Sequence, residues 1–223
     1  MNNTIDFSQS EMLSLIQRSS YLFGDIDWKY MENINRVVKQ ALNDYSSVFA
    51  LRIDLRFANP EVGCSESPTC FQRAAGQVMK RFIASLKSQL LAYEIRRKKD
   101  GIRVHPTKLR YVWVCEQNEA ELPHYHLIIV LNKAAYWRLN SFQSPESLAG
   151  KIQKAWCSAL RLYYPEFGNL VHFPENCEYV ITRDDAINRT PIFMAFIHRV
   201  SYLAKVRTKI CMDGRRAIGN SWW

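Results

Sequence analysis

The sequence lacks the features that mark several common classes of protein. No apolar run approaches the length that spans a membrane, and residues 1–6 have neither a basic start nor an apolar segment behind them. We therefore expect neither a membrane protein nor an exported one. The six cysteines contain no C-x-x-C pair, which argues against a zinc ribbon or knuckle. Without an export signal, they are expected to be reduced thiols in the cytoplasm.

The chain also lacks internal repeats, low-complexity tracts and an obvious linker. Its 223 residues are 48% hydrophobic, which is enough for one domain with a real core and a modest extension. Apolar residues at helical spacing predict that residues 1–46 form a helical N-terminal arm. Residues 47–223 are then expected to form a single domain of catalytic size.

Acidic residues are scarce near the C-terminal end, and the formal net charge of the whole chain is +9. Such a balance favours a polyanionic partner, although a basic protein without any nucleic-acid role is the plain alternative. The basic run 96–99 has a similar alternative, as a solvated helix end favoured by the helix dipole. The C-terminal basic cluster consists of Arg199, Lys205, Arg207, Lys209, Arg215 and Arg216.

Hydrophobic periodicity predicts an α+β fold. Strands are expected at 48–57, 109–116, 124–131 and 178–182, and helices at 71–99, 145–164 and 191–209. The first strand should have one buried and one polar face, the polar one carrying Arg52 and Asp54. The second and third should form an antiparallel hairpin. A central antiparallel sheet with helices packed on it, as in ferredoxin-like or RNA-recognition folds, fits this order.

Two histidines bracket a tyrosine at the start of the apolar run 127–131. Because side chains alternate along a strand, His124 and His126 should project from one face, and Glu116 on the preceding strand could complete a divalent-cation site. Asp54 or Gln117 is the next choice for the third ligand. Alternatively, the histidines are strand-edge residues bonded to nearby carboxylates, and Glu116 is an ordinary exposed turn residue.

A second chemical element lies near the C-terminal end. Tyr202 precedes Lys205 by three residues on a predicted helix, so the two side chains can face one site. His198 shares that helix face and is expected to serve as a base, a phosphate contact or packing. Tyr202 could instead be a core residue that packs against Phe196 and Ile197.

Together these motifs resemble the HUH endonuclease superfamily, which includes rolling-circle replication initiators, relaxases and single-strand transposases. More narrowly, the segments 52–56 (RIDLR), 123–126 (PHYH) and 201–205 (SYLAK) look like those of the YagK/YfjJ-type family of prophages, which is similar to replication proteins of filamentous phages. The resemblance covers about residues 48–218 and leaves the N-terminal arm outside. Tyr125 is a large middle residue for the histidine motif and adds a rival hydroxyl near the metal unless it packs under the sheet.

The resemblance implies a metal-dependent nuclease domain over residues 47–223. Tyr202 would be the nucleophile, assisted by Lys205, with Mg²⁺ or Mn²⁺ held by His124, His126 and Glu116. Asp54 and His198 would be accessory. The DNA-binding residues would be Arg199, Arg207, Lys209, Arg215 and Arg216.

The same resemblance implies the partners and the reaction. Single-stranded DNA, as an origin or a hairpin, would be nicked and rejoined through a 5′-phosphotyrosine, with a host helicase and polymerase as further partners and no membrane. Two alternatives stay open: a non-catalytic, single-stranded nucleic-acid-binding regulator on the same sheet, and a transposase or relaxase with the same chemistry. His105 and His172 lie in predicted loops without evident partners and are left out of the site.

Overall fold

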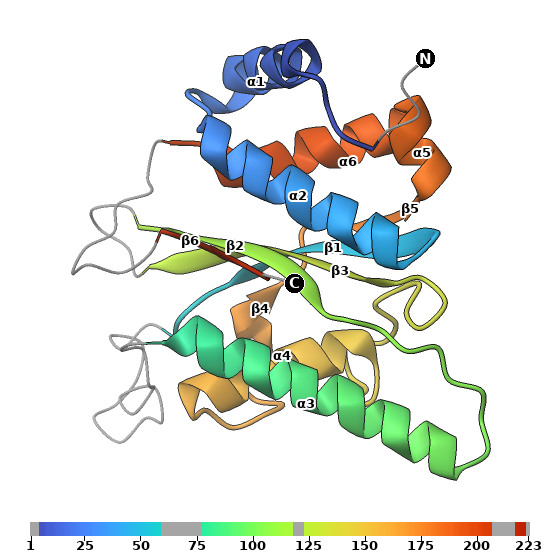
Figure 1. Ribbon diagram of the computed structural model, residues 1–223. Helices are drawn as coiled ribbons and strands as arrows, with labels where there is room; N and C mark the ends of the chain where they lie inside the picture. The colour runs from blue at the N-terminus through green and yellow to red at the C-terminus, as the bar shows by residue number, and fades with distance from the viewer. Residues whose placement is uncertain (1–4, 59–76, 118–122, 207–216, 222–223) are drawn as a thin grey trace.

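The computed structural model describes residues 5–58, 77–117, 123–206 and 217–221. Its layers are one six-stranded antiparallel sheet with helices on both faces (Figure 1), which confirms the predicted α+β class. The helices are α1 (Gln9–Phe23), α2 (Trp28–Asp44), α3 (Val78–Lys99), α4 (Leu148–Leu160), α5 (Arg183–Asn188) and α6 (Pro191–Ser201). The strands are β1 (Ser47–Leu55), β2 (Arg110–Glu116), β3 (His124–Asn132), β4 (Val171–His172), β5 (Glu178–Thr182) and β6 (Ile218–Asn220). Among the described residues, no helix combines the length and apolar character needed to cross a membrane.

The predicted hairpin of β2 and β3 lies inside the sheet, where β3 also pairs with β1. The sheet runs β4-β1-β3-β2-β6, and β5 also pairs with β1, beside β4. From β1 to β5 the chain follows the β-α-β-β-α-β order of the expected ferredoxin-like arrangement, with the two-residue strand β4 added before β5. The short strands β4 and β6 were not predicted, because two or three residues are too few to show an alternating pattern.

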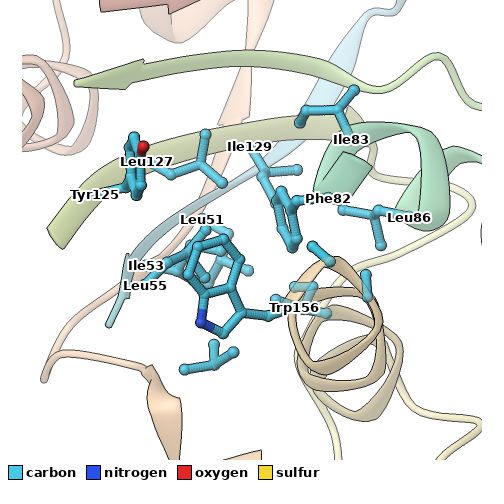
Figure 2. Close-up of a cluster of buried hydrophobic side chains, with 14 of the residues drawn as sticks. Leu51, Ile53, Leu55, Phe82, Ile83, Leu86, Tyr125, Leu127, Ile129 and Trp156 are labelled. Carbon is cyan, nitrogen blue, oxygen red and sulfur yellow. The ribbon is translucent and has the colours of Figure 1, made fainter. Parts of the chain in front are cut away.

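One face of the sheet packs against α3 and α4. Alternate residues of β1 and β3 meet apolar residues of both helices, as Figure 2 shows, so that face is a continuous apolar layer. The cluster includes Leu51, Ile53, Leu55, Phe82, Leu86, Leu127, Ile129 and Trp156. The indole nitrogen of Trp156 also donates a hydrogen bond of 2.7 Å to the backbone carbonyl of Arg56, which ties α4 to the end of β1.

The opposite face is covered by α2 and α6, with α1 packed outside them (Figure 1). Apolar residues of α2 and α6 contact Val112, Val114, Ile128 and Val130, so the helices of residues 1–46 share one core with the sheet. The predicted polar face of β1 is therefore buried as well. Arg52 and Asp54 are 9% and 7% exposed, because the helices cover the face that a bare sheet would leave in water.

Helix α4 begins later than predicted. We expected the helix to start at residue 145, but it starts at Leu148 with Ser147 as its cap, and the Ser147 hydroxyl accepts a hydrogen bond of 2.9 Å from the Gly150 amide. The segment from Ser144 folds back onto the first turn of the helix. A Cβ atom at Gly150 would meet the carbonyl oxygen of Ser144 and lie 2.8 Å from Pro145 Cα. This close approach requires glycine.

Replacing Gly150 with alanine should lower the free energy of unfolding by about 1–3 kcal/mol, because the new methyl group strikes backbone atoms that cannot rotate away. Chemical denaturation measures the change. Gly168→Ala is the control, since its Cβ would lie 3.4 Å from the flexible Gln153 side chain. Equal stability of the two variants would contradict the close approach at Gly150.

Candidate metal centre and its neighbouring tyrosine

The register of the β2–β3 hairpin brings Glu116, His124 and His126 together. Glu116 pairs directly with His124, and His126 lies two residues farther along the same strand. Since alternate strand residues share a face, both histidines and the glutamate project toward the layer of α2 and α6. The three residues therefore meet at one end of the sheet on one face, as the sequence predicted.

Their ligand atoms lie within 4.8 Å of one another, an arrangement that can hold a metal ion. Glu116 Oε2 is 3.3 Å from His126 Nε2 and 4.0 Å from His124 Nε2, and the two imidazole rings stand at 88° to each other. Glu116 and His126 are buried, whereas His124 is half-buried. His126 Nε2 is buried without a hydrogen bond of good geometry among the described residues. A buried nitrogen of this kind needs a partner, and coordination to a metal ion would supply one. Two imidazoles and a carboxylate therefore fit a divalent metal.

Asp54 orients His126 from the neighbouring strand. It pairs with His126 across β1 and β3, and its Oδ1 lies 2.5 Å from His126 Nδ1. This bond leaves Nε2 of the same ring directed at Glu116. Burial alone would raise the pKa of the Asp54 carboxyl, but the hydrogen bond with His126 and the charge of Arg52 lower that pKa to about 2. The pKa of His126 is raised, since the two carboxylates outweigh the opposing effect of burial.

Two residues of this site were missed by sequence reasoning. Arg52 lies two residues before Asp54 on β1, and its guanidinium is 3.5 Å from both Asp54 Oδ1 and His126 Nδ1. The available signal was its place beside Asp54 on the polar face predicted for this strand. His172 was set aside as a loop residue, yet it lies on β4 with Nδ1 3.5 Å from Asp54 Oδ2. A two-residue strand gives no pattern that could have placed it.

Tyr202 follows the end of α6 instead of lying within a longer helix. The prediction that this helix continues to residue 209 was wrong: α6 ends at Ser201, and residues 202–204 form a 3₁₀ turn. The connection between α1 and α2 holds that turn. The amide of Asp27 donates to the carbonyl of Ala204 at 2.7 Å, and Ile26 forms a β-bridge with Lys205. The N-terminal helices thus help to position Tyr202.

The side chain of Tyr202 lies against the candidate metal centre. Its ring is 5.1 Å from that of His126, edge to face, and the Arg52 guanidinium lies 4.7 Å from the ring centroid. Lys205 Nζ is 5.1 Å from the same centroid. The pKa of the Tyr202 hydroxyl is raised by burial and by the nearby Glu116 carboxylate, while Arg52 acts in the opposite direction. The tyrosine, the cations and the metal group share one site.

The remaining predicted residues are more dispersed. Tyr125 points to the opposite face of the sheet, on the side of Trp156 (Figure 2), and its ring contacts both Trp156 and Trp113, so it is no rival hydroxyl at the candidate metal site. The ring of His198 packs at 5.6 Å from that of Phe23. Arg199 is half-buried, and its guanidinium donates to the carbonyl of Glu175 at 2.9 Å. The predicted DNA-binding residues Arg207, Lys209, Arg215 and Arg216 lie outside the described residues.

Replacing Asp54 with asparagine should weaken Mn²⁺ binding about 10- to 100-fold, since His126 loses the carboxylate that selects its tautomer and orients its ring. Isothermal titration calorimetry measures the affinity. Asp184→Asn, at an exposed position of α5, is the charge-matched control and should bind Mn²⁺ normally. Wild-type affinity in the Asp54 variant would show that this hydrogen bond does not support the metal site.

Comparison with known proteins places this site in a family. Residues 8–221 match the YagK/YfjJ C-terminal domain family, so the match includes α1 and α2, which the sequence resemblance had left outside. The uncharacterized protein YagK of Escherichia coli strain K12 is 33% identical over 193 residues, covering 86% of this chain and 92% of YagK. The uncharacterized protein YfjJ of the same strain is 32% identical over 204 residues, covering 89% of this chain and 96% of YfjJ. No solved structure matches the chain.

Proposed function

The chain belongs to the YagK/YfjJ C-terminal domain family, and from that premise we propose that it is an HUH-type endonuclease that nicks and rejoins single-stranded DNA. The reaction would pass through a 5′-phosphotyrosine on Tyr202. Support comes from the geometry of the site and from the order of the sequence motifs.

One observation carries the proposal. Tyr202, from a distant part of the chain, lies against the candidate metal group of Glu116, His124 and His126. Its ring contacts His126 edge to face and lies 4.7 Å from the Arg52 guanidinium, and the Glu116 carboxylate raises the pKa of its hydroxyl. A protein that only binds nucleic acid needs aromatic and basic side chains, but it has no need of a tyrosine hydroxyl beside two histidines and a carboxylate. The binding-module alternative leaves this juxtaposition without a purpose.

The residues of the site suit attack on a phosphodiester. When bound, Mg²⁺ or Mn²⁺ would polarise the non-bridging oxygens of the scissile phosphate. A tyrosine hydroxyl is a weak nucleophile at neutral pH, and burial raises the pKa of Tyr202 further, so the positive charges of Arg52 and Lys205 near its ring favour the phenolate that forms during attack. Tyr202 Oη bonds to phosphorus, the bond to the 3′ oxygen breaks, and that oxygen leaves as a hydroxyl with the proton that the phenol gave up.

This chemistry suits the initiation of rolling-circle replication on a phage or prophage element. The phosphotyrosine bond conserves the energy of the phosphodiester, so the 3′-hydroxyl can attack it and rejoin the strand without ATP. Before the strand is rejoined, a host polymerase in the cytoplasm could extend the 3′ end while a host helicase unwinds the DNA ahead of it. A transposase or relaxase would use the same residues in the same way.

The test is incubation of the protein with labelled single-stranded origin or hairpin DNA and Mn²⁺, followed by a denaturing gel. We expect a labelled band at the mass of the protein plus DNA, which disappears when EDTA is present. DNA that binds in a native assay without ever forming this band would leave the non-catalytic binding module as the function.

Lys205→Ala should slow adduct formation about 10²- to 10³-fold without abolishing it, because one cation near the developing negative charge is lost while Arg52 remains. Single-turnover rates at saturating DNA measure the effect. Lys87→Ala removes an exposed lysine of α3 and should react at the wild-type rate. An unchanged rate in the Lys205 variant would assign that lysine to packing.

A further inference from the structure

A pocket lies at the end of the sheet opposite the candidate metal group. It has a volume of about 390 Å³ and is lined by the last turns of α3, residues 103–107, residues 134–140 and the start of α4. It adjoins the end of β3, whose nine residues separate it from His124 by roughly 27 Å at the usual rise per residue. The pocket is therefore distinct from the site of Tyr202.

Three aromatic side chains form part of its wall. The rings of Tyr93 and Tyr136 lie 6.2 Å apart, and Trp137 beside them is 53% exposed, with the Arg138 guanidinium 3.9 Å from the centroid of its ring. Tyr136 is only 9% exposed, so its ring forms an ordered part of the wall.

The acidic side chains of the pocket are paired with basic residues, whereas its arginines are not paired with carboxylates. Its two carboxylates are already paired outside it, Glu146 with Arg96 and Glu94 with Lys98. Its two arginines, Arg97 and Arg103, form no ion pair with a carboxylate in the described part of the chain; the Arg97 guanidinium bonds only the Tyr93 hydroxyl, at 3.3 Å. The two guanidinium groups are therefore available to bind an anionic ligand in the pocket.

A further cation lies behind the aromatic wall. Lys151 Nζ is 4.3 Å from the centroid of the Tyr93 ring, and the residue is 3% exposed. Lys98 and Lys99 continue the basic run beyond Arg97 at the end of α3. The basic run 96–99, which the proposed reaction does not use, therefore adjoins an aromatic pocket.

We propose that this pocket binds a nucleotide, with its base stacked on Trp137 and its phosphate held by Arg97 and Arg103. Aromatic faces accept any base by stacking, and guanidinium groups suit phosphate oxygens in pairs. The volume lies in the range of small-molecule sites. The nucleotide is either an unpaired residue of single-stranded DNA or a free mononucleotide. The proposal goes beyond the nicking reaction, because binding here needs neither metal nor Tyr202.

The experiment measures binding of the full chain to a fluorescein-labelled oligothymidylate and, separately, to thymidine monophosphate, both in EDTA. Trp137→Ala should weaken oligonucleotide binding about 5- to 100-fold, as expected for a lost stacking contact. The double substitution Arg97→Ala and Arg103→Ala should reduce the slope of log affinity against log salt by about 1.4, at roughly 0.7 for each phosphate contact on a single strand. Circular dichroism checks that both proteins are folded.

Matched controls remove the same groups elsewhere. Tyr21→Ala takes away an aromatic ring that is 90% exposed on α1. The double substitution of the exposed Arg18 and Lys87 by alanine removes two positive charges, as many as the arginine double variant loses. Both should bind like the wild type. A loss confined to thymidine monophosphate would support the pocket and identify a free nucleotide as its ligand.

Two results would overturn the proposal. One is wild-type binding of both probes by both pocket variants. The other is a loss in the arginine double variant alone, since a charged surface without a base contact explains it. Because no probe is cleaved in EDTA, these outcomes are independent of whether Tyr202 forms an adduct.

Discussion

Replacing Tyr202 with phenylalanine should eliminate the covalent protein–DNA adduct while leaving the fold, Mn²⁺ binding and DNA binding close to those of the wild type. The substitution removes one oxygen atom. The phenyl ring can keep its edge-to-face contact with His126 and its place beneath the Arg52 guanidinium. Only the atom that would attack phosphorus is lost, so the effect on adduct formation should exceed every effect on stability. A denaturing gel with labelled DNA measures the adduct, and calorimetry measures the metal affinity.

Three tyrosines provide controls for this experiment. Tyr125 points to the other face of the sheet, Tyr163 is 71% exposed after α4, and Tyr164 lies beside it. Their phenylalanine variants should still form the adduct at the wild-type rate. An adduct that persists in Tyr202→Phe and disappears in one of the controls would move the nucleophile to that residue.

Replacing His126 with alanine should reduce Mn²⁺ affinity by more than about 100-fold, which is the upper effect expected for residues that only support a ligand. His126 is central to the site, because its two ring nitrogens contact Asp54 and Glu116. Cleavage should be abolished with metal binding, whereas most DNA affinity should remain, since it comes mainly from phosphate contacts by arginine and lysine. Calorimetry with Mn²⁺ and a native binding assay separate the two effects.

His124→Ala is the companion variant, because its half-buried side chain can be removed with less disturbance of the core. It should also abolish cleavage and weaken Mn²⁺ binding. His105→Ala, at the opposite end of the sheet, is the matched histidine control for metal binding and should bind Mn²⁺ like the wild type. Normal Mn²⁺ binding in the His124 and His126 variants together would refute the metal centre.

The sequence by itself determined the hairpin and, with it, the group of Glu116, His124 and His126 that could hold a metal ion. The alternating pattern of residues 110–116 and the apolar run after His126 place two strands next to each other, joined by a short segment, and such strands pair antiparallel. Side-chain alternation then requires His124 and His126 to share a face. Both steps depend on residues close together in the chain, which is why local pattern was sufficient.

Only the tertiary structure decided how the rest of the site is assembled. Local periodicity favoured a helix through Tyr202, but the α1–α2 connection bonds the backbone at Ala204 and Lys205, so the helix ends and a tighter turn presents the tyrosine. The alternation of Arg52 and Asp54 with apolar residues shows only that the strand has two different faces. That α6 and the turn after it cover the polar face follows from packing of segments more than a hundred residues from β1 in the chain, which no local pattern records.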